Sequence, residues 1–172
     1  MSWLVVPVTV SALIALQALY VAAEFATVSA RRTRLAQLAH EGDRLAGLLH
    51  AVVDDPRRLD AYIAACQVGI TASNLILGFY GQARLTPVLA PRLAEAGLSS
   101  PAAAPSVATT LVLLFLTALQ VILGELVPKN IGVQYPERLA LATAVPMRWS
   151  MIVFRPVIAL FNGSGRGILR FL

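Results

Sequence analysis

Residues 2–23 read SWLVVPVTVSALIALQALYVAA and contain no Asp, Glu, Lys or Arg. A membrane-spanning helix needs about 20 mainly apolar residues, because each residue advances the helix by only about 1.5 Å. This stretch is therefore long enough to cross a bilayer. A signal peptide fits less well, since Met1 and Ser2 supply no basic residue and the apolar run exceeds a typical signal-peptide core.

Two further stretches carry no charge, residues 61–83 and 96–124. We therefore predict an all-α membrane protein with three spans, over about residues 3–28, 61–81 and 106–127. The composition agrees, because 58% of the 172 residues are hydrophobic and 13% are charged, whereas a typical soluble domain is about 25% charged. These values exclude a soluble globular domain and a disordered chain, and a single cysteine excludes a disulfide scaffold.

A fourth apolar stretch, residues 139–161, is interrupted by two prolines and by Arg148 and Arg155. An arginine at the centre of a bilayer costs at least about 2.5 kcal/mol. We therefore favour an amphipathic juxtamembrane helix over about residues 137–162, with Trp149 as an interfacial anchor. A fourth span is the less favoured alternative.

The basic residues are distributed unevenly along the chain. None precedes the first span, six lie in residues 29–60, two in 82–105 and six in 128–172. By the positive-inside rule, this pattern places the N-terminus outside and the C-terminus in the cytoplasm. We expect the protein to be a multi-pass protein of a bacterial inner membrane. The basic excess then faces lipid headgroups, and we expect no nucleic-acid partner.

The segments between the spans differ in character. Leucines recur near helical spacing in residues 31–59, which predicts a cytoplasmic helical hairpin. Asp54 and Asp55 directly before Pro56 predict a capped helix start ahead of the second span. Residues 82–105 are rich in proline and alanine and are typical of a linker.

Each predicted span carries polar or small residues at intervals of three, four or seven, which places them on one helical face. They are Gln17, Tyr20, Glu24 and Thr27 in the first span, Gln67, Thr71, Asn74, Gly78 and Gln82 in the second, and Thr110, Thr117, Gln120 and Gly124 in the third. Any one such residue is most simply explained as a contact that holds membrane helices together. Three stripes together with two carboxylates, Glu24 and Glu125, favour an ion path, although both acids lie near span ends where water is close.

The segment GELVPK, residues 124–129, is the sharpest local feature. Pro128 has no N–H to donate to the carbonyl of Gly124, so the pattern predicts a helix break and a hinge. Carbonyl and carboxylate oxygens suit a hard cation such as Mg²⁺ or Ca²⁺. The two histidines and Cys66 show no metal-ligand spacing, which argues against zinc or copper.

Three segments resemble the transmembrane domain of the CorC/cyclin M (CNNM) family of magnesium transporters. They are AEFATVSARRTRL at 23–35, QVGITASNLILG at 67–78 and GELVPK at 124–129. The last is fairly specific, and the resemblance extends over nearly the whole chain. It implies a homodimer of three-span protomers that transports Mg²⁺, usually outward, with Na⁺ as the suggested coupling ion.

The resemblance also implies a Mg²⁺ site among the three helices. Glu24 matches a polar position of the family and would be either a ligand or a residue on the Na⁺ side. Residues 21–23 are Val-Ala-Ala where many members have small polar residues, so the first helix would supply fewer ligands. The ligands that the resemblance implies are Ser29, Ser73, Asn74, Glu125 and, through its carbonyl, Gly124.

Members of this family usually continue into a nucleotide-binding CBS-type regulatory domain. We expect residues 1–172 to be a single transmembrane domain from which that domain is absent, with lipids, a second copy and the CBS-type domain of the full-length protein as partners. The alternative is a non-transporting anchor or sensor that dimerises and relays signals to the missing domain. An enzyme is not expected, because the spans contain no Ser/His or paired-Asp arrangement.

Overall fold

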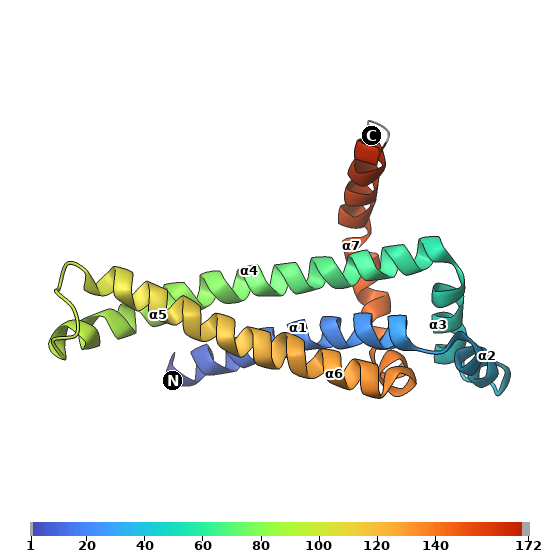
Figure 1. Cartoon of the computed structure of the whole chain (residues 1–172), viewed down its shortest axis with the longest axis horizontal. Coiled ribbons are helices and arrows are strands. Elements are labelled where there is room, and N and C mark those ends of the chain that lie inside the picture. The colour runs from blue at the N-terminus through green and yellow to red at the C-terminus, as the bar shows by residue number, and fades with distance from the viewer. Residues whose placement is uncertain (1, 170–172) are drawn as a thin grey trace. The chain divides into compact units, whose positions relative to one another are not determined.

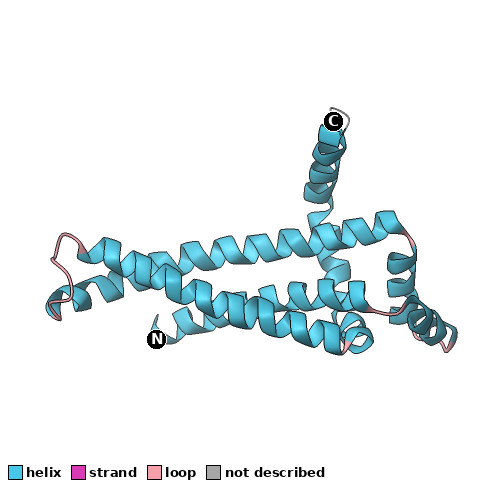
Figure 2. Ribbon diagram, in the orientation of Figure 1, coloured by secondary structure: helices cyan, strands magenta, loops and turns pink. Residues whose placement is uncertain are grey.

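The computed structural model describes residues 2–169, with side chains for residues 4–160, and this part of the chain is helical without strands (Figures 1 and 2). The all-α prediction is confirmed. The elements are α1 (Ser2–Ser29), α2 (Arg32–His40), α3 (Arg44–Asp54), α4 (Pro56–Glu95), α5 (Ala104–Leu119), the π-helix η1 (Gln120–Leu126), α6 (Val127–Gln134) and α7 (Pro136–Leu169).

Among the residues that the structure describes, three helical stretches are long and apolar enough to cross a membrane: Leu4–Ser29, Pro56–Glu95 and Ala104–Gln134. The prediction of three candidate spans is therefore confirmed. Helix α7 is not among the stretches that meet this criterion within the described residues.

The start of α4 is set by local chemistry. The helix begins at Pro56, and the Asp55 carboxylate accepts a hydrogen bond of 2.9 Å from the backbone N–H of Arg57. Proline suits the first helical position, because its φ is already helical and its missing N–H would have had no partner there. The predicted cap is confirmed.

The end of α4 differs from the prediction. Residues 82–95 are helical rather than part of a linker, and the helix passes through Pro87 and Pro91. Each proline removes one backbone hydrogen bond and its ring crowds the carbonyl four residues earlier, but the surrounding residues are mostly Ala, Leu and Arg, which are strong helix formers. The helix ends where Gly97 adopts a φ of +69° and Leu98 N–H donates to Leu93 O, which is a glycine-terminated cap.

The path before Pro128 also differs from the predicted break. Residues 120–126 form a π-helix, and its last hydrogen bond runs from Val127 N–H to Ile122 O. The chain then continues as α6 through Pro128. Unpaired backbone groups are costly in a membrane, so a widened helical turn that keeps its hydrogen bonds up to the residue before proline is favoured over a break.

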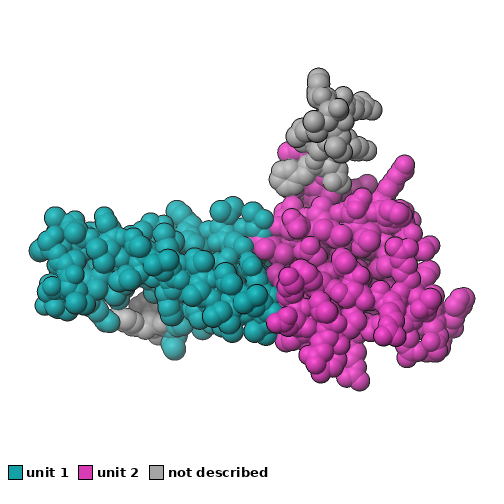
Figure 3. Space-filling view, in the orientation of Figure 1, with its two compact units in different colours: residues 1–18, 71–127 teal, residues 19–70, 128–172 magenta. Residues whose placement is uncertain are grey.

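The chain divides into two compact units (Figure 3). Unit 1 comprises residues 1–18 and 71–127, and unit 2 comprises residues 19–70 and 128–172. Unit 1 contains an apolar core in which Ile14 of α1 and Leu77 of α4 pack with two buried side chains of α5.

Unit 2 contains the short helices α2 and α3, which pack on each other, and α3 also packs on α7. One of its cores contains Tyr20, Tyr62, Cys66 and Met147. The ring of Tyr20 lies so close to α4 that a Cβ built on Gly69 would come within 2.5 Å of it. A glycine at this position therefore lets the aromatic ring pack directly against the helix backbone.

Candidate cation site

In unit 1, α1 and η1 are joined by a hydrogen bond between polar side chains. Gln17 Nε2 donates to Glu125 Oε1 at 3.0 Å. Gln17 is fully buried and Glu125 is half-buried. The bond fixes the carboxylate against α1 while part of it stays accessible, so Glu125 can present an oxygen to a cation.

Two buried amide oxygens of unit 1 have no hydrogen-bond partner among the described residues. They are Gln17 Oε1 and Asn74 Oδ1. Leaving a buried polar atom unpaired costs about 1–3 kcal/mol, and the great majority of such atoms in folded proteins are paired. These two acceptors are therefore the most unusual feature of the unit, and both are hard oxygen ligands of the kind that Mg²⁺ and Ca²⁺ bind.

Gly124 makes room for the Gln17 carboxamide. A Cβ built on Gly124 would lie 2.7 Å from Gln17 Oε1. Gly124, a predicted carbonyl ligand, therefore lies beside one of the unpaired oxygens with no room for a side chain between them. Two consecutive residues, Gly124 and Glu125, both face the Gln17 side chain.

Of the six predicted ligands, the structure places Ser73, Asn74, Gly124 and Glu125 in unit 1. Ser73 is 2% exposed, so it belongs to the interior of the helix packing.

The other two predicted residues lie in unit 2. Glu24 is half-buried and accepts a hydrogen bond from the Gln67 side chain. Ser29 is the last residue of α1, is exposed, and lines a polar cavity of about 730 Å³ together with Arg31, Arg34 and others. The joint action of the six residues remains a prediction.

Gln17 is the site residue that the sequence analysis did not select. The signal was present, because Gln17 begins the polar stripe of the first span. Spacing along one helix could not show that its partner is Glu125, which is 108 residues away.

Within the described residues, no group of three or more His, Cys, Asp or Glu side chains is arranged to hold a metal. The candidate ligands of unit 1 are amide, hydroxyl and carbonyl oxygens and one carboxylate, that of Glu125.

The family model described as the cyclin M transmembrane N-terminal domain (CNNM) matches residues 8–172. The chain belongs to the CNNM family. Together with the three apolar helices found among the described residues, this makes it an integral membrane protein.

Similar proteins include UPF0053 protein YhdT of Bacillus subtilis, which is 37% identical over 159 residues, covering 92% of this chain and 34% of YhdT. UPF0053 protein YugS of the same organism is 34% identical over 165 residues, covering 95% and 37%. The polyamine export protein of Haemophilus influenzae is 30% identical over 151 residues, covering 88% and 34%. The CNNM domain thus spans about a third of the length of these relatives.

Proposed function

We propose that this CNNM domain carries Mg²⁺ across the membrane, in the outward direction and with Na⁺ as the coupling ion. The observation that carries the proposal is the pair of buried, unpaired amide oxygens in unit 1, Gln17 Oε1 and Asn74 Oδ1. A buried acceptor without a donor is costly, and a bound cation would compensate for that cost.

The proposed site has a division of roles. Gln17 Nε2 donates to Glu125 Oε1 and so orients the carboxylate. The other carboxylate oxygen, Glu125 Oε2, is left for the ion. Gln17 Oε1, Asn74 Oδ1, Ser73 and the Gly124 carbonyl complete an oxygen shell. Mg²⁺ gives up its water reluctantly, so several protein oxygens must act together to replace part of its hydration.

Glu24 and Ser29 are assigned separate roles in the proposal. Glu24 attracts cations from the cytoplasm, with Na⁺ as one candidate, because a carboxylate near a span end raises the local cation concentration. Ser29, exposed at the end of α1, is the weakest of the proposed ligands. The functional unit is proposed to be a homodimer regulated by a CBS-type domain in the full-length protein.

The test is Mg²⁺ flux into liposomes that contain the purified chain and a trapped Mg²⁺-sensitive dye. Asn74→Ala removes one unpaired oxygen and should lower flux at least about tenfold, since losing one good ligand costs about 1.4 kcal/mol or more. Gln82→Ala is the matched control, because Gln82 is an exposed amide on the same helix and in the same unit.

The outcomes separate the alternatives. Normal flux in Asn74→Ala, with unchanged assembly by size-exclusion chromatography, removes the site assignment. If the wild-type chain shows no Mg²⁺ flux, the anchor or sensor hypothesis is favoured, in which the polar residues of the spans only hold the helices together. Loss of flux when Na⁺ is replaced by a large organic cation supports coupling.

A second candidate function is polyamine export, which the name of the Haemophilus influenzae relative suggests. A polyamine carries several ammonium groups, and each can donate to a carboxylate or an amide oxygen. Liposome uptake of labelled spermidine, measured beside Mg²⁺ flux in the same preparation, distinguishes the two. Mg²⁺ transport predicts that spermidine is not carried and that Asn74→Ala affects Mg²⁺ alone.

A further inference from the structure

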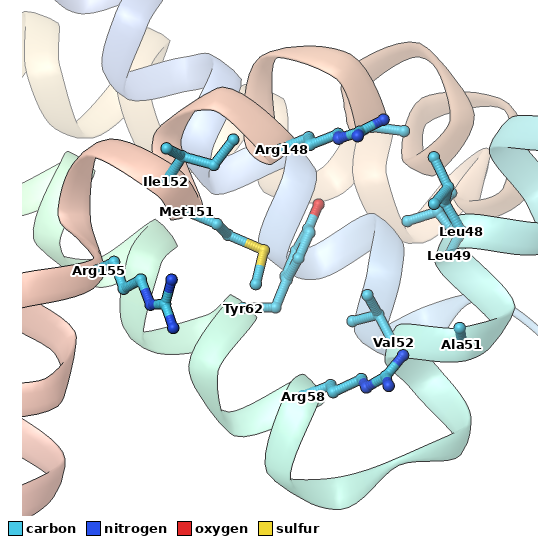
Figure 4. A pocket seen from close by; sticks show the side chains of 11 residues that line it. Leu48, Leu49, Ala51, Val52, Arg58, Tyr62, Arg148, Met151, Ile152 and Arg155 are labelled. Carbon is cyan, nitrogen blue, oxygen red and sulfur yellow. The ribbon is translucent and has the colours of Figure 1, made fainter.

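Unit 2 contains an apolar cavity of about 420 Å³ whose lining includes three arginines. Its apolar lining comes from α3 and α7, with Tyr62 of α4 beside Met151 (Figure 4). The arginine side chains are Arg58 of α4 and Arg148 and Arg155 of α7, and Figure 4 shows them spaced around Tyr62 and Met151. The cavity therefore combines an apolar interior with cationic groups at its edges.

A second cavity of about 340 Å³ shares part of this lining. Leu48, Ala144, Arg148 and Ile152 contribute to both cavities, so Arg148 is common to two adjoining apolar spaces. The second cavity also includes Trp149, which is 67% exposed. Tryptophan is enriched at the level of lipid headgroups, where its ring is half in water and half in hydrocarbon.

Of the three arginines that line the cavities, one has an acidic partner within the described residues and two have none. Arg58 Nε pairs with Asp55 Oδ2 at 3.3 Å, and both side chains are largely exposed. Arg148 and Arg155 form no ion pair within the described residues. Arginine donates several N–H bonds in a planar fork that matches a phosphate group.

Two ligand requirements follow from this arrangement. The apolar lining favours a ligand with hydrocarbon chains, which a small hydrophilic anion lacks. The two guanidinium groups without an acidic partner favour a phosphate. We propose that this part of unit 2 is a binding site for an anionic diacyl phospholipid, with its phosphate at Arg148 and Arg155 and its two acyl chains in the two cavities. None of the residues that line the two cavities is a proposed Mg²⁺ ligand.

The test uses Trp149 as a reporter in the purified chain. The sequence has two tryptophans, so a Trp3→Phe background leaves Trp149 as the only one. Phosphatidylglycerol with brominated acyl chains, added in small amounts to detergent micelles, should quench Trp149 fluorescence saturably. Brominated phosphatidylcholine should require roughly thirtyfold more lipid, because attraction of an anionic headgroup contributes about 1 kcal/mol for each of the two arginines and every 1.4 kcal/mol is a factor of about ten.

The double variant R148Q/R155Q should lose this preference for the anionic lipid. Arg57→Gln is the matched control, because Arg57 is an exposed arginine beside Arg58 that does not line either cavity. Circular dichroism of each variant confirms that the helices persist.

Three results would overturn the proposal. The first is equal quenching by the two brominated lipids. The second is a preference that survives in the double variant or disappears equally in Arg57→Gln. The third is displacement of phosphatidylglycerol by millimolar inorganic phosphate, which would mean that the arginines recognise a free anion rather than a lipid.

Discussion

The polar face of α1 behaves differently in the two units. In unit 2, Tyr20 Oη shares a hydrogen bond of 3.0 Å with Ser150 Oγ, and Thr27 Oγ1 donates to Tyr62 Oη at 3.2 Å. In unit 1, Gln17 donates through its nitrogen but keeps an unpaired oxygen. The same spacing of polar residues therefore occurs in a packing contact and in a candidate ion site. The two differ in whether the polar atoms have hydrogen-bond partners, not in their spacing.

The largest expected effect is stabilisation by Mg²⁺. A ligand that binds only the folded state at 100 times its dissociation constant adds about 2.7 kcal/mol to the free energy of unfolding. Gln17→Leu should abolish this gain, because it removes both an acceptor and the donor that orients Glu125. Thermal unfolding in detergent, with Mg²⁺ and with EDTA, measures the difference.

In EDTA, Gln17→Leu should lose no more than about 1 kcal/mol, because the substitution removes a buried unpaired oxygen as well as a hydrogen bond. An equal Mg²⁺ shift in both proteins would contradict the assignment of Gln17 to the site.

The next effect concerns the paired contacts of unit 2. Tyr62→Phe should lower the free energy of unfolding by about 1–2 kcal/mol, because it leaves the buried Thr27 hydroxyl without its partner. Tyr80→Phe is the control, since the Tyr80 ring contact with Arg84 survives the loss of the hydroxyl. If the two variants unfold at the same temperature, the hydroxyl pair does not stabilise unit 2.

The smallest change in stability is expected for Gly124→Ala. The new methyl group would displace the Gln17 oxygen, which is the end of a flexible side chain, while alanine gains about 0.5–1 kcal/mol over glycine in a helix. The free energy of unfolding should therefore change by less than about 1 kcal/mol, although Mg²⁺ affinity should fall about tenfold. Gly78→Ala is the control, because its new methyl group would meet no atom within 4 Å, and this variant should retain Mg²⁺ affinity. Similar Mg²⁺ affinity in the two variants would show that Gly124 is not part of the site.

The sequence predicted the features that depend on local pattern. The charge-free runs predicted the three apolar helices, and Asp55 with Pro56 predicted the start of α4. It did not predict that α4 continues through Pro87. Composition alone does not show whether the destabilisation by proline or the helix propensity of the surrounding residues is larger. It did not identify Gln17 as a site residue either, because a partner 108 residues away leaves no trace in the spacing of one helix.

In the π-helix η1, the number of residues matters more than their identity, because that number sets which side chains face Gln17. Consecutive side chains of an α-helix diverge by about 100°, yet Gly124 and Glu125 both meet Gln17. A π turn is in effect an α-helix with one residue inserted. Deleting any one of residues 120–123 should convert the π-helix into an ordinary α-helix and so separate Glu125 from Gln17. Exchanging one apolar residue for another at the exposed Val121, Ile122 or Leu123 should leave the hydrogen bond between Gln17 and Glu125 in place.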